Sequence, residues 1–382
     1  MQNLVKKFED TIVTIEQMEI LEDKKTNLKE IISKIQKWIE INYESPVKFF
    51  RINLYRLSDE QNIDLYSLLN GFLFLVKEGL FILNWEYHCP HCNGLADFKH
   101  NFSQLRGEGF CPICDVKFRA ILDQNIEVTF TIHPEYYLIP NKIEEEYRND
   151  MHQKILEHQY QLEKPFLTGL ECINSNFFQE LFGNYVLSVE ESLSIQNIVI
   201  MFTDLKDSTR MYDQFGDTIS YNIVREHFKL LFRTIENHHG IVIKTIGDAV
   251  MASFIKTEDA IKASLEIFQN FLDRIWDPAG RLEIKIGLHK GPVIVVNSNN
   301  RLDYFGHHVN LASRIQSQLK KHSVGFTKSI YQDQDTKTLL LEFIKQNKEN
   351  HHDIKLFRKI ANLKGIQEEI PIYYLTANMS LQ

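Results

Sequence analysis

The chain has 382 residues, of which 43% are hydrophobic and 25% are charged, and its formal net charge is −8. This composition is typical of a soluble globular protein with two or three domains, and the negative charge argues against nucleic-acid binding over the whole surface. No uncharged apolar run reaches the ~20 residues of a membrane span, and the charged N-terminus is not that of a signal peptide. We therefore expect a cytoplasmic protein without a membrane segment.

The N-terminal region, residues 1–85, is predicted to be mainly helical. Apolar residues recur every three or four positions from residue 1 to about residue 45, which is the helical period. Short helices and then a strand, FILNWEYH, are expected to follow. The stretch LSDEQNIDLYSLLNGFLFLVKEGLF has the length of a helix–turn–helix, but helix pairs of this length mostly serve packing. Nucleic-acid binding is therefore not expected.

Residues 86–135 contain two Cys-Pro-x-Cys pairs separated by 18 residues. Four thiolates in this pattern are typical of a zinc-ribbon-like module with one tetrahedral, structural Zn²⁺. The predicted zinc ligands are Cys89, Cys92, Cys111 and Cys114. Unmetallated or redox-active thiols are the alternative. His88 and His91 adjoin the ligands and could substitute for them, although loop histidines are more often solvated, and Cys172 is interpreted as a core residue.

Residues 136–194 are charged and partly helical, and we interpret them as a connector. From residue 195 to residue 382, apolar strands alternate with amphipathic helices in the order βαββαβ, the ferredoxin-like arrangement. The predicted elements are NIVIMFTD, the helix TISYNIVREHFKLLFRTIENHHG, the hairpin IVIKTIGDAVMASF, the helix TEDAIKASLEIFQNFLDRI, and a strand pair in LEIKIGLHKGPVIVV turned at Lys290-Gly291-Pro292. The predicted fold class is α+β, with a mainly helical region and a zinc ribbon before it.

Two aspartates in this domain are candidate metal ligands. In a βαββαβ sheet, the end of the first strand lies beside the turn between the second and third strands. Asp204 and Asp248 can therefore meet at one sheet edge, where two carboxylates suit Mg²⁺ or Mn²⁺. Taken singly, Asp204 could instead cap a helix and Asp248 could be an ordinary turn residue.

Other polar residues favour a nucleotide site. Lys244 lies on the same hairpin as Asp248, and Asp303 precedes a helix on which Asn310 and Arg314 are four residues apart. The spacing puts the amide and the guanidinium on one helix face. Such a pair suits a sugar oxygen and a phosphate.

Three segments, FTDLKDST, KTIGDAVMASF and LDYFGHHVNLASRI, resemble in order the signature segments of class III nucleotidyl cyclases, and the similarity covers about residues 195–376. The resemblance implies that Asp204 and Asp248 bind two Mg²⁺ or Mn²⁺ ions, with the backbone carbonyl of Leu205 as a further ligand. It also implies that Lys244 and Asp303 read the adenine edge. Adenine offers an acceptor at N1 and a donor at N6, whereas guanine N1 carries a proton and would need an acceptor in place of the lysine.

The same resemblance implies that Asn310 orients the ribose, that Arg314 stabilises the transition state, and that Lys364 binds phosphate. His307 and His308 depart from the family pattern, and they are either solvated loop residues or an altered part of the pocket. Arg301 receives no role, and Lys206 and Asp207 are interpreted as surface and cap residues.

The implied reaction converts ATP to 3′,5′-cyclic AMP and pyrophosphate, at sites shared between two chains of a head-to-tail homodimer. The alternatives are another base specificity, GTP or a pyrimidine nucleotide, or a catalytically weak cyclase fold that dimerises a zinc-ribbon/helix–turn–helix binding protein. The N-terminal half resembles domains with paired cysteines that precede some bacterial cyclases. This similarity suggests a regulatory role but names no ligand or partner.

Overall fold

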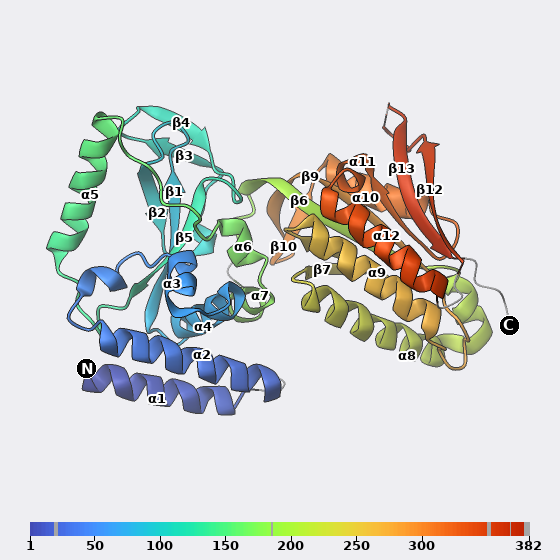
Figure 1. Cartoon of the computed structure of the whole chain (residues 1–382), viewed down its shortest axis with the longest axis horizontal. Coiled ribbons are helices and arrows are strands. Elements are labelled where there is room, and N and C mark those ends of the chain that lie inside the picture. Colours follow the sequence, from blue (N-terminus) through green and yellow to red (C-terminus); the bar gives the residue numbers. More distant parts are fainter. Residues whose placement is uncertain (19–21, 185, 350–352, 367, 378–382) are drawn as a thin grey trace. The chain divides into compact units, whose positions relative to one another are not determined.

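The computed structural model describes residues 1–18, 22–184, 186–349, 353–366 and 368–377. The chain divides into two compact units (Figure 1). The first contains residues 1–194 and the short segment 296–302, and the second contains residues 195–295 and the chain from residue 303 onward. Each unit has its own β-sheet. Among the described residues, no helix is long and apolar enough to cross a membrane.

Residues 1–85 of the N-terminal unit are mainly helical, as predicted. The expected helix over residues 1–45 forms two helices, and residues 19–21 within that prediction lie outside the described residues. The two helices of the predicted helix–turn–helix stretch, which begin at Leu54 and Leu65, each have a side-chain cap. The side chain of Asn53 accepts a hydrogen bond from the amide of Arg56, and the side chain of Asp64 accepts one from the amide of Ser67. The helices are α1 (Gln2–Glu16), α2 (Glu22–Ile41), the 3₁₀ turn η1 (Pro46–Phe49), α3 (Leu54–Gln61), α4 (Leu65–Lys77), α5 (Asn141–Leu156), α6 (Gly169–Ile173) and α7 (Asn176–Phe182).

A three-stranded antiparallel sheet organises this unit, with β1 (Phe81–His88) between β2 (Leu95–Lys99) and β5 (Ile126–Ile132). The predicted strand FILNWEYH is β1 itself. The paired cysteines lie at the end of β1 and on the ribbon formed by β3 (Glu108–Cys111) and β4 (Val116–Arg119). The 3₁₀ turn η2 (Phe102–Gln104) lies between them along the chain.

The second unit contains the predicted βαββαβ fold. Its sheet has the order β12-β13-β11-β9-β6-β8-β7, and β10 pairs with β9. The first four strands along the chain therefore occur in the order fourth, first, third, second, which is the ferredoxin-like order. The strands are β6 (Ser192–Leu205), β7 (Ile241–Ile246), β8 (Ala249–Phe254), β9 (Ile284–Ser298), β10 (Arg301–Phe305), β11 (Ser323–Thr327), β12 (Ile354–Ala361) and β13 (Ile370–Ala377).

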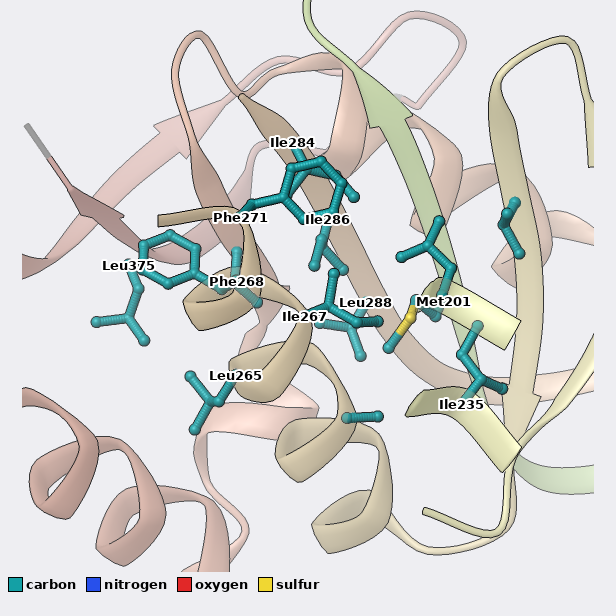
Figure 2. Close-up of a cluster of buried hydrophobic side chains, with 14 of the residues drawn as sticks. Met201, Ile235, Leu265, Ile267, Phe268, Phe271, Ile284, Ile286, Leu288 and Leu375 are labelled. Atoms are coloured by element: carbon teal, nitrogen blue, oxygen red, sulfur yellow. The ribbon is translucent and has the colours of Figure 1, made fainter. Parts of the chain in front are cut away.

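Helices cover both faces of this sheet. The helices are α8 (Ser208–Asn237), α9 (Thr257–Asp273), α10 (His307–Ser317), α11 (Lys328–Tyr331) and α12 (Gln334–Glu349). Figure 2 shows the core between α9 and the sheet, where Phe268 and Phe271 lie near Ile284, Ile286 and Leu288 of β9. All five side chains are fully excluded from solvent. Burial on this scale is the main force that holds the helix to the sheet.

Helix α10 packs against the opposite face of β9. A Cβ added at Gly287 would lie 2.6 Å from the carbonyl oxygen of Ala312 and 2.4 Å from the amide nitrogen of Gln316. Only glycine allows this approach, which sets α10 directly against the sheet.

One sequence prediction in this unit was wrong. Residues 290–292 do not form a turn, because β9 runs unbroken from Ile284 to Ser298 and a following hairpin leads into β10. The helix predicted from Thr218 is present, and a further helical stretch from Ser208 precedes it, with a kink between the two at Gly216, whose φ is +74°. The continuous strand carries the chain from the core of the sheet to the β9–β10 hairpin.

Candidate active site and cysteine cluster

The two predicted metal aspartates meet at one sheet edge. Asp204 lies near the end of β6, and Asp248 lies in the turn from β7 to β8, which pairs with β6. Gly247 in that turn has a φ of +64°, a conformation that glycine adopts without strain. The pKa of Asp248 is raised, first by burial and also by the charge of Asp204, while hydrogen bonds from Ser208 and the backbone of Leu205 oppose the shift.

This edge fits a cation. The Oδ2 atom of Asp248 is buried and has no hydrogen-bond partner among the described residues. An unpaired buried carboxylate oxygen is costly, and a bound divalent cation would satisfy it. Leu205, the last residue of β6, is buried beside it. The donor set is all oxygen, which is the set that Mg²⁺ and Mn²⁺ prefer.

Two residues that the sequence analysis did not select complete the surroundings of Asp204. The Nζ atom of Lys285 lies 2.5 Å from Oδ2 of Asp204, and the side-chain amide of Gln316 donates to the same oxygen at 3.1 Å. Lys285 interrupts the apolar strand LEIKIG, and this interruption was an available signal. Lys206, by contrast, donates to Glu283 at 2.9 Å, in agreement with a surface role.

The predicted base-reading residues are also together. Lys244 on β7 and Asp303 on β10 are 59 positions apart in the chain, yet Nζ of Lys244 donates to Oδ2 of Asp303 at 2.5 Å. The other oxygen of Asp303 accepts from the amide of Tyr304 at 2.8 Å. The ring of Phe305 lies 5.6 Å from the lysine nitrogen. Asp303 is buried and Lys244 is about one-third exposed, so the lysine end of the pair is open to a ligand.

Helix α10 and the β12–β13 hairpin bring the remaining predicted residues together. Asn310 is exposed and Arg314 is half-buried on α10. A Cβ added at Gly365 would lie 3.5 Å from Nη2 of Arg314, so the guanidinium lies against the hairpin that carries the exposed Lys364. Arg314 of α10 therefore lies next to the turn of the hairpin that includes Lys364.

The two unusual histidines differ in their surroundings. His307 is exposed, whereas Nδ1 of His308 lies 2.7 Å from Nε2 of His289, a residue the sequence analysis did not select. The two rings are nearly parallel, and His289 also contacts the hydroxyl of Thr327 at 2.8 Å. Burial, with the nearby His308 and His307, lowers the pKa of His289 to about 3. A neutral His289 thus fixes the first turn of α10 to β9.

The four paired cysteines form one cluster in the N-terminal unit. Their sulfur atoms all lie within 4.8 Å of one another, and the sulfurs of Cys92 and Cys111 are 3.8 Å apart. Four sulfurs at about 2.3 Å from a tetrahedral zinc would be about 3.8 Å apart. Backbone amides of His91 and Cys114 also point at Cys89 and Cys111 sulfurs, at 3.4 and 3.5 Å. The geometry fits the predicted ion.

One histidine next to this cluster differs from the sequence prediction. His88 is buried and contacts Glu127, so it is not solvated. Cys172 is fully buried, as expected, and burial raises the pKa of its thiol.

Comparisons with known proteins give two family matches for this chain. Residues 190–376 match the profile of the adenylate and guanylate cyclase catalytic domain. Residues 14–275 match a family of unknown function, DUF5939, over more than half of the chain. The chain belongs to the DUF5939 family. This DUF5939 chain thus carries a class III adenylyl/guanylyl cyclase catalytic domain in its second half.

Relatives of the DUF5939 chain include cyclases of both kinds. An adenylate cyclase of Anabaena cylindrica is 26% identical over 227 residues, which are 52% of this chain and 43% of that protein. Guanylate cyclase 2G of Mus musculus is 29% identical over 135 residues, 32% of this chain and 12% of that protein. The chain thus spans less than half of the length of these relatives. The crystal structure of the adenylyl cyclase CyaB from P. aeruginosa has a TM-score of 0.39 and 20% identity, covering 50% of this chain and 98% of that one.

Proposed function

We propose that this nucleotidyl cyclase domain converts ATP to 3′,5′-cyclic AMP and pyrophosphate. The observation that carries the proposal is the contact between Lys244 and Asp303, since a lysine donor and a carboxylate acceptor side by side complement N1 and N6 of adenine. Guanine carries a proton on N1, so two hydrogen-bond donors, N1–H and the lysine ammonium, would face each other. The adenylate cyclase of Anabaena cylindrica among the relatives supports the same choice.

In the proposed reaction, the ribose 3′-oxygen attacks the α-phosphorus in line. A new bond forms between these atoms, the bond from the α-phosphorus to the pyrophosphate oxygen breaks, and the 3′-hydroxyl proton passes to water. Asp204, Asp248 and the carbonyl of Leu205 would hold two Mg²⁺ or Mn²⁺ ions, which when bound lower the pKa of the 3′-hydroxyl and neutralise the triphosphate. Lys285 forms an ion pair with Asp204 and balances its charge.

Residues of α10 and the β12–β13 hairpin would act on the other side of the nucleotide. Asn310 would orient the ribose, and Arg314 would stabilise the charge that develops on the α-phosphate, with Lys364 on the polyphosphate. Positioning and charge stabilisation of this kind account for most catalysis in phosphoryl transfer.

We further propose that two chains form a head-to-tail homodimer with two shared sites. On α10, the side chain of Gln316 reaches Asp204 of its own chain, whereas Arg314 lies against Gly365 of the β12–β13 hairpin. Residues two apart on a helix point to nearly opposite sides, about 160° apart, because each residue turns the helix by about 100°. This divergence supports a role for Arg314 at the metal aspartates of a partner.

A structural zinc ion in the N-terminal unit is the last part of the proposal. Four thiolates would leave no coordination position open for a substrate. Burial, with the neighbouring cysteines, raises the pKa of the Cys92 thiol. A bound cation would favour the thiolate over this partly buried thiol. The ion would tie the end of β1 to the β3–β4 ribbon.

The direct test is to incubate the purified chain with each of the four nucleoside triphosphates and Mn²⁺ and to identify products by mass. Cyclic AMP from ATP, absent in Asp248→Ala, is the expected result. A preferred product with another base would refute the base assignment, and no cyclic product from any triphosphate would favour a dimerising role for the fold.

A further inference from the structure

The central sheet of the N-terminal unit has two buried faces of opposite character. Side chains alternate along β1, so that Phe81, Leu83, Trp85 and Tyr87 form an apolar face that is buried throughout. The other face is mostly buried, yet it is largely polar. It contains Asn84, Glu86 and His88 of β1 and Glu127, Thr129 and Thr131 of β5. Glu86 pairs with Glu127 and Asn84 with Thr129, while the partly buried Thr131 pairs with Ile82. Burying such groups is costly unless they have partners and a purpose.

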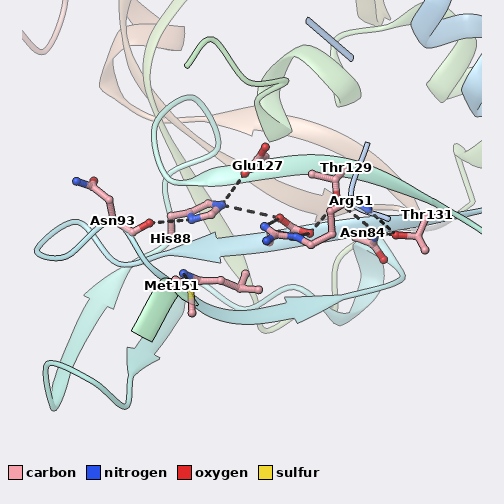
Figure 3. A network of polar contacts seen from close by, with 10 residues as sticks. Arg51, Asn84, His88, Asn93, Glu127, Thr129, Thr131 and Met151 are labelled. Carbon is pink, nitrogen blue, oxygen red and sulfur yellow. Dashed lines mark hydrogen bonds and ion pairs between the residues drawn. The ribbon is translucent and has the colours of Figure 1, made fainter. Parts of the chain in front are cut away.

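These polar groups form one connected network (Figure 3). Nε of Arg51 donates to Glu86 at 2.7 Å, and its Nη2 donates to the second carboxylate oxygen. Nε2 of His88 lies 2.7 Å from Glu127, and Asn84 donates to the hydroxyls of Thr129 and Thr131. Burial alone would raise the pKa of Glu86, but Arg51 holds it below its usual value. The network is a rigid, already paired surface.

The network does not provide a metal site of its own. Ligand atoms of Glu86, His88 and Glu127 lie within 4.8 Å of one another. However, Arg51 already occupies both oxygens of Glu86 and places a positive charge beside them. A cation would have to displace this ion pair, so we interpret the cluster as the polar floor of the neighbouring cavity.

A cavity of about 190 Å³ opens above one half of this floor. A single water needs about 10–15 Å³ in the same measure, so the cavity has room for a small organic molecule. Its polar floor includes Arg51, Asn84, Glu86 and Thr131. The remaining lining residues are Phe50, Ile82, Leu95, Phe98, His100, Glu144, Tyr147 and Arg148. Aromatic walls around a few fixed polar groups are typical of small-molecule sites.

The charges that line the cavity are balanced in pairs. Arg51 is neutralised by Glu86, and Arg148 at the rim lies 2.6 Å from Glu144. An ion would therefore find no uncompensated partner. Arg51 nevertheless has five N–H donors, and the two bonds to Glu86 use two of them. A donor therefore remains for an acceptor atom of an uncharged ligand.

Helix α5, which covers the cavity, is held at one end. Its buried residues are Met151 and Ile155, both in its C-terminal half. Met151 accepts from the amide of Leu95 at 3.2 Å, and a Cβ on Gly94 would lie 2.4 Å from Ile155. The N-terminal half lies over the cavity through Tyr147, whose ring is 4.2 Å from the Arg51 guanidinium. The ring of Tyr147 also meets Phe50, with the ring centroids 6.1 Å apart, and a ligand in the cavity would add apolar contacts to this half.

We propose that this cavity binds a small, uncharged, planar aromatic or heteroaromatic molecule that carries a hydrogen-bond acceptor. The ring system lies among Phe50, Phe98 and Tyr147, and the acceptor meets Arg51 on the polar floor. Binding adds contacts that hold the N-terminal half of α5 over the sheet. This site lies wholly in the N-terminal unit and does not depend on the cyclase assignment.

The test uses the full chain and quinoline, a neutral two-ring probe with one acceptor nitrogen. Saturation-transfer NMR should show binding, and hydrogen exchange over α5 should slow when quinoline is added. Tyr147→Ala and Ile82→Trp, which remove a wall and fill the floor, should each weaken binding by about tenfold or more, a loss of about 1.4 kcal/mol. Glu145→Ala is the matched control, since this exposed residue of α5 does not line the cavity.

Several results would overturn the proposal. One is the absence of a saturation-transfer signal for quinoline, and another is an equal signal in wild type and Tyr147→Ala when both are correctly folded. Displacement of quinoline by ATP, or preferential binding of the anion benzoate, would also contradict the proposed ligand class. Tyr147→Ala trims a partly exposed side chain, so it keeps the test decisive even where Ile82→Trp fails to fold. Since the measurement needs no turnover, a chain without cyclase activity could still bind quinoline, and the two proposals fail separately.

Discussion

Mixing two inactive variants should restore activity when the active site is shared between chains. Asp204→Ala removes a proposed metal ligand, and Arg314→Ala removes the proposed transition-state cation. In the structure these two side chains have different surroundings. Asp204 contacts Lys285 and Gln316, whereas Arg314 lies against Gly365. Each homodimer then has two broken sites. A mixed dimer has one site with both lesions and one site with none.

The expected recovery follows from random pairing. At equal amounts, half of the dimers are mixed, and each mixed dimer has one working site of two, so activity should return to about a quarter of that of wild type. Each substitution leaves the core intact, because Asp204 is about one-third exposed and Arg314 is half-buried. Asp204→Ala leaves Lys285 without its partner, which costs about 1–3 kcal/mol. Asp204→Asn, which still offers Lys285 an oxygen, is therefore the matched second variant.

The assay measures cyclic AMP from each variant alone and from the mixture after chains have exchanged. Differently tagged copies, recovered together and weighed by mass spectrometry, report the exchange. A mixture that stays inactive despite confirmed exchange would refute the shared site, since a site built within one chain cannot be repaired by a partner.

Three further predictions concern base choice, zinc and pH. Lys244→Glu with Asp303→Cys should shift the ATP:GTP preference by about ten- to a hundredfold, because one lost hydrogen bond with an unpaired partner costs about 1–3 kcal/mol; an unchanged ratio in steady-state kinetics would contradict the role. Elemental analysis should find about one zinc per chain, and Cys89→Ser with Cys92→Ser should lose it and lower the melting temperature of the N-terminal unit, whereas a metal-free native protein would argue against zinc. His289 should remain neutral in the fold, since its pKa is about 3. In the unfolded chain the imidazole of His289 binds a proton near pH 6.5. Acidification from pH 7 to pH 5 should therefore lower the free energy of unfolding of wild type by about 2 kcal/mol more than that of His289→Gln, as measured by denaturant titration. Equal losses in the two proteins would contradict this prediction.

Much of the site was accessible from local sequence. Asp204 follows an apolar strand, Asp248 lies in a glycine turn, and two Cys-x-x-Cys pairs have the spacing of one cluster. These signals are local because strand ends, tight turns and metal knuckles each depend on a few adjacent residues. The βαββαβ order followed from hydrophobic periodicity, and the sheet order agrees with it.

Other features were decided by the tertiary structure alone. Lys290-Gly291-Pro292 has the composition of a turn, yet β9 continues through it. The strand is held in place because it pairs with β6 and β11 in the sheet, and Gly291 leaves room for the ring of His308. The bond from Gln316 to Asp204 required α10 to approach β9 at Gly287, a contact between segments far apart in the chain. Periodicity tells which side chains share a face, but it does not tell what packs against that face.

The polar face of β1 shows the same limit. The alternation in FILNWEYH separates apolar from polar residues, which would normally indicate that Asn84, Glu86 and His88 face water. The structure buries them instead, because Arg51 and the strand β5 supply partners for each charge and α5 covers them. The sequence by itself determined which residues share that face of β1. Whether that face met solvent or a closed, charge-balanced interior depended on segments up to about 70 residues away, and only their packing decided it.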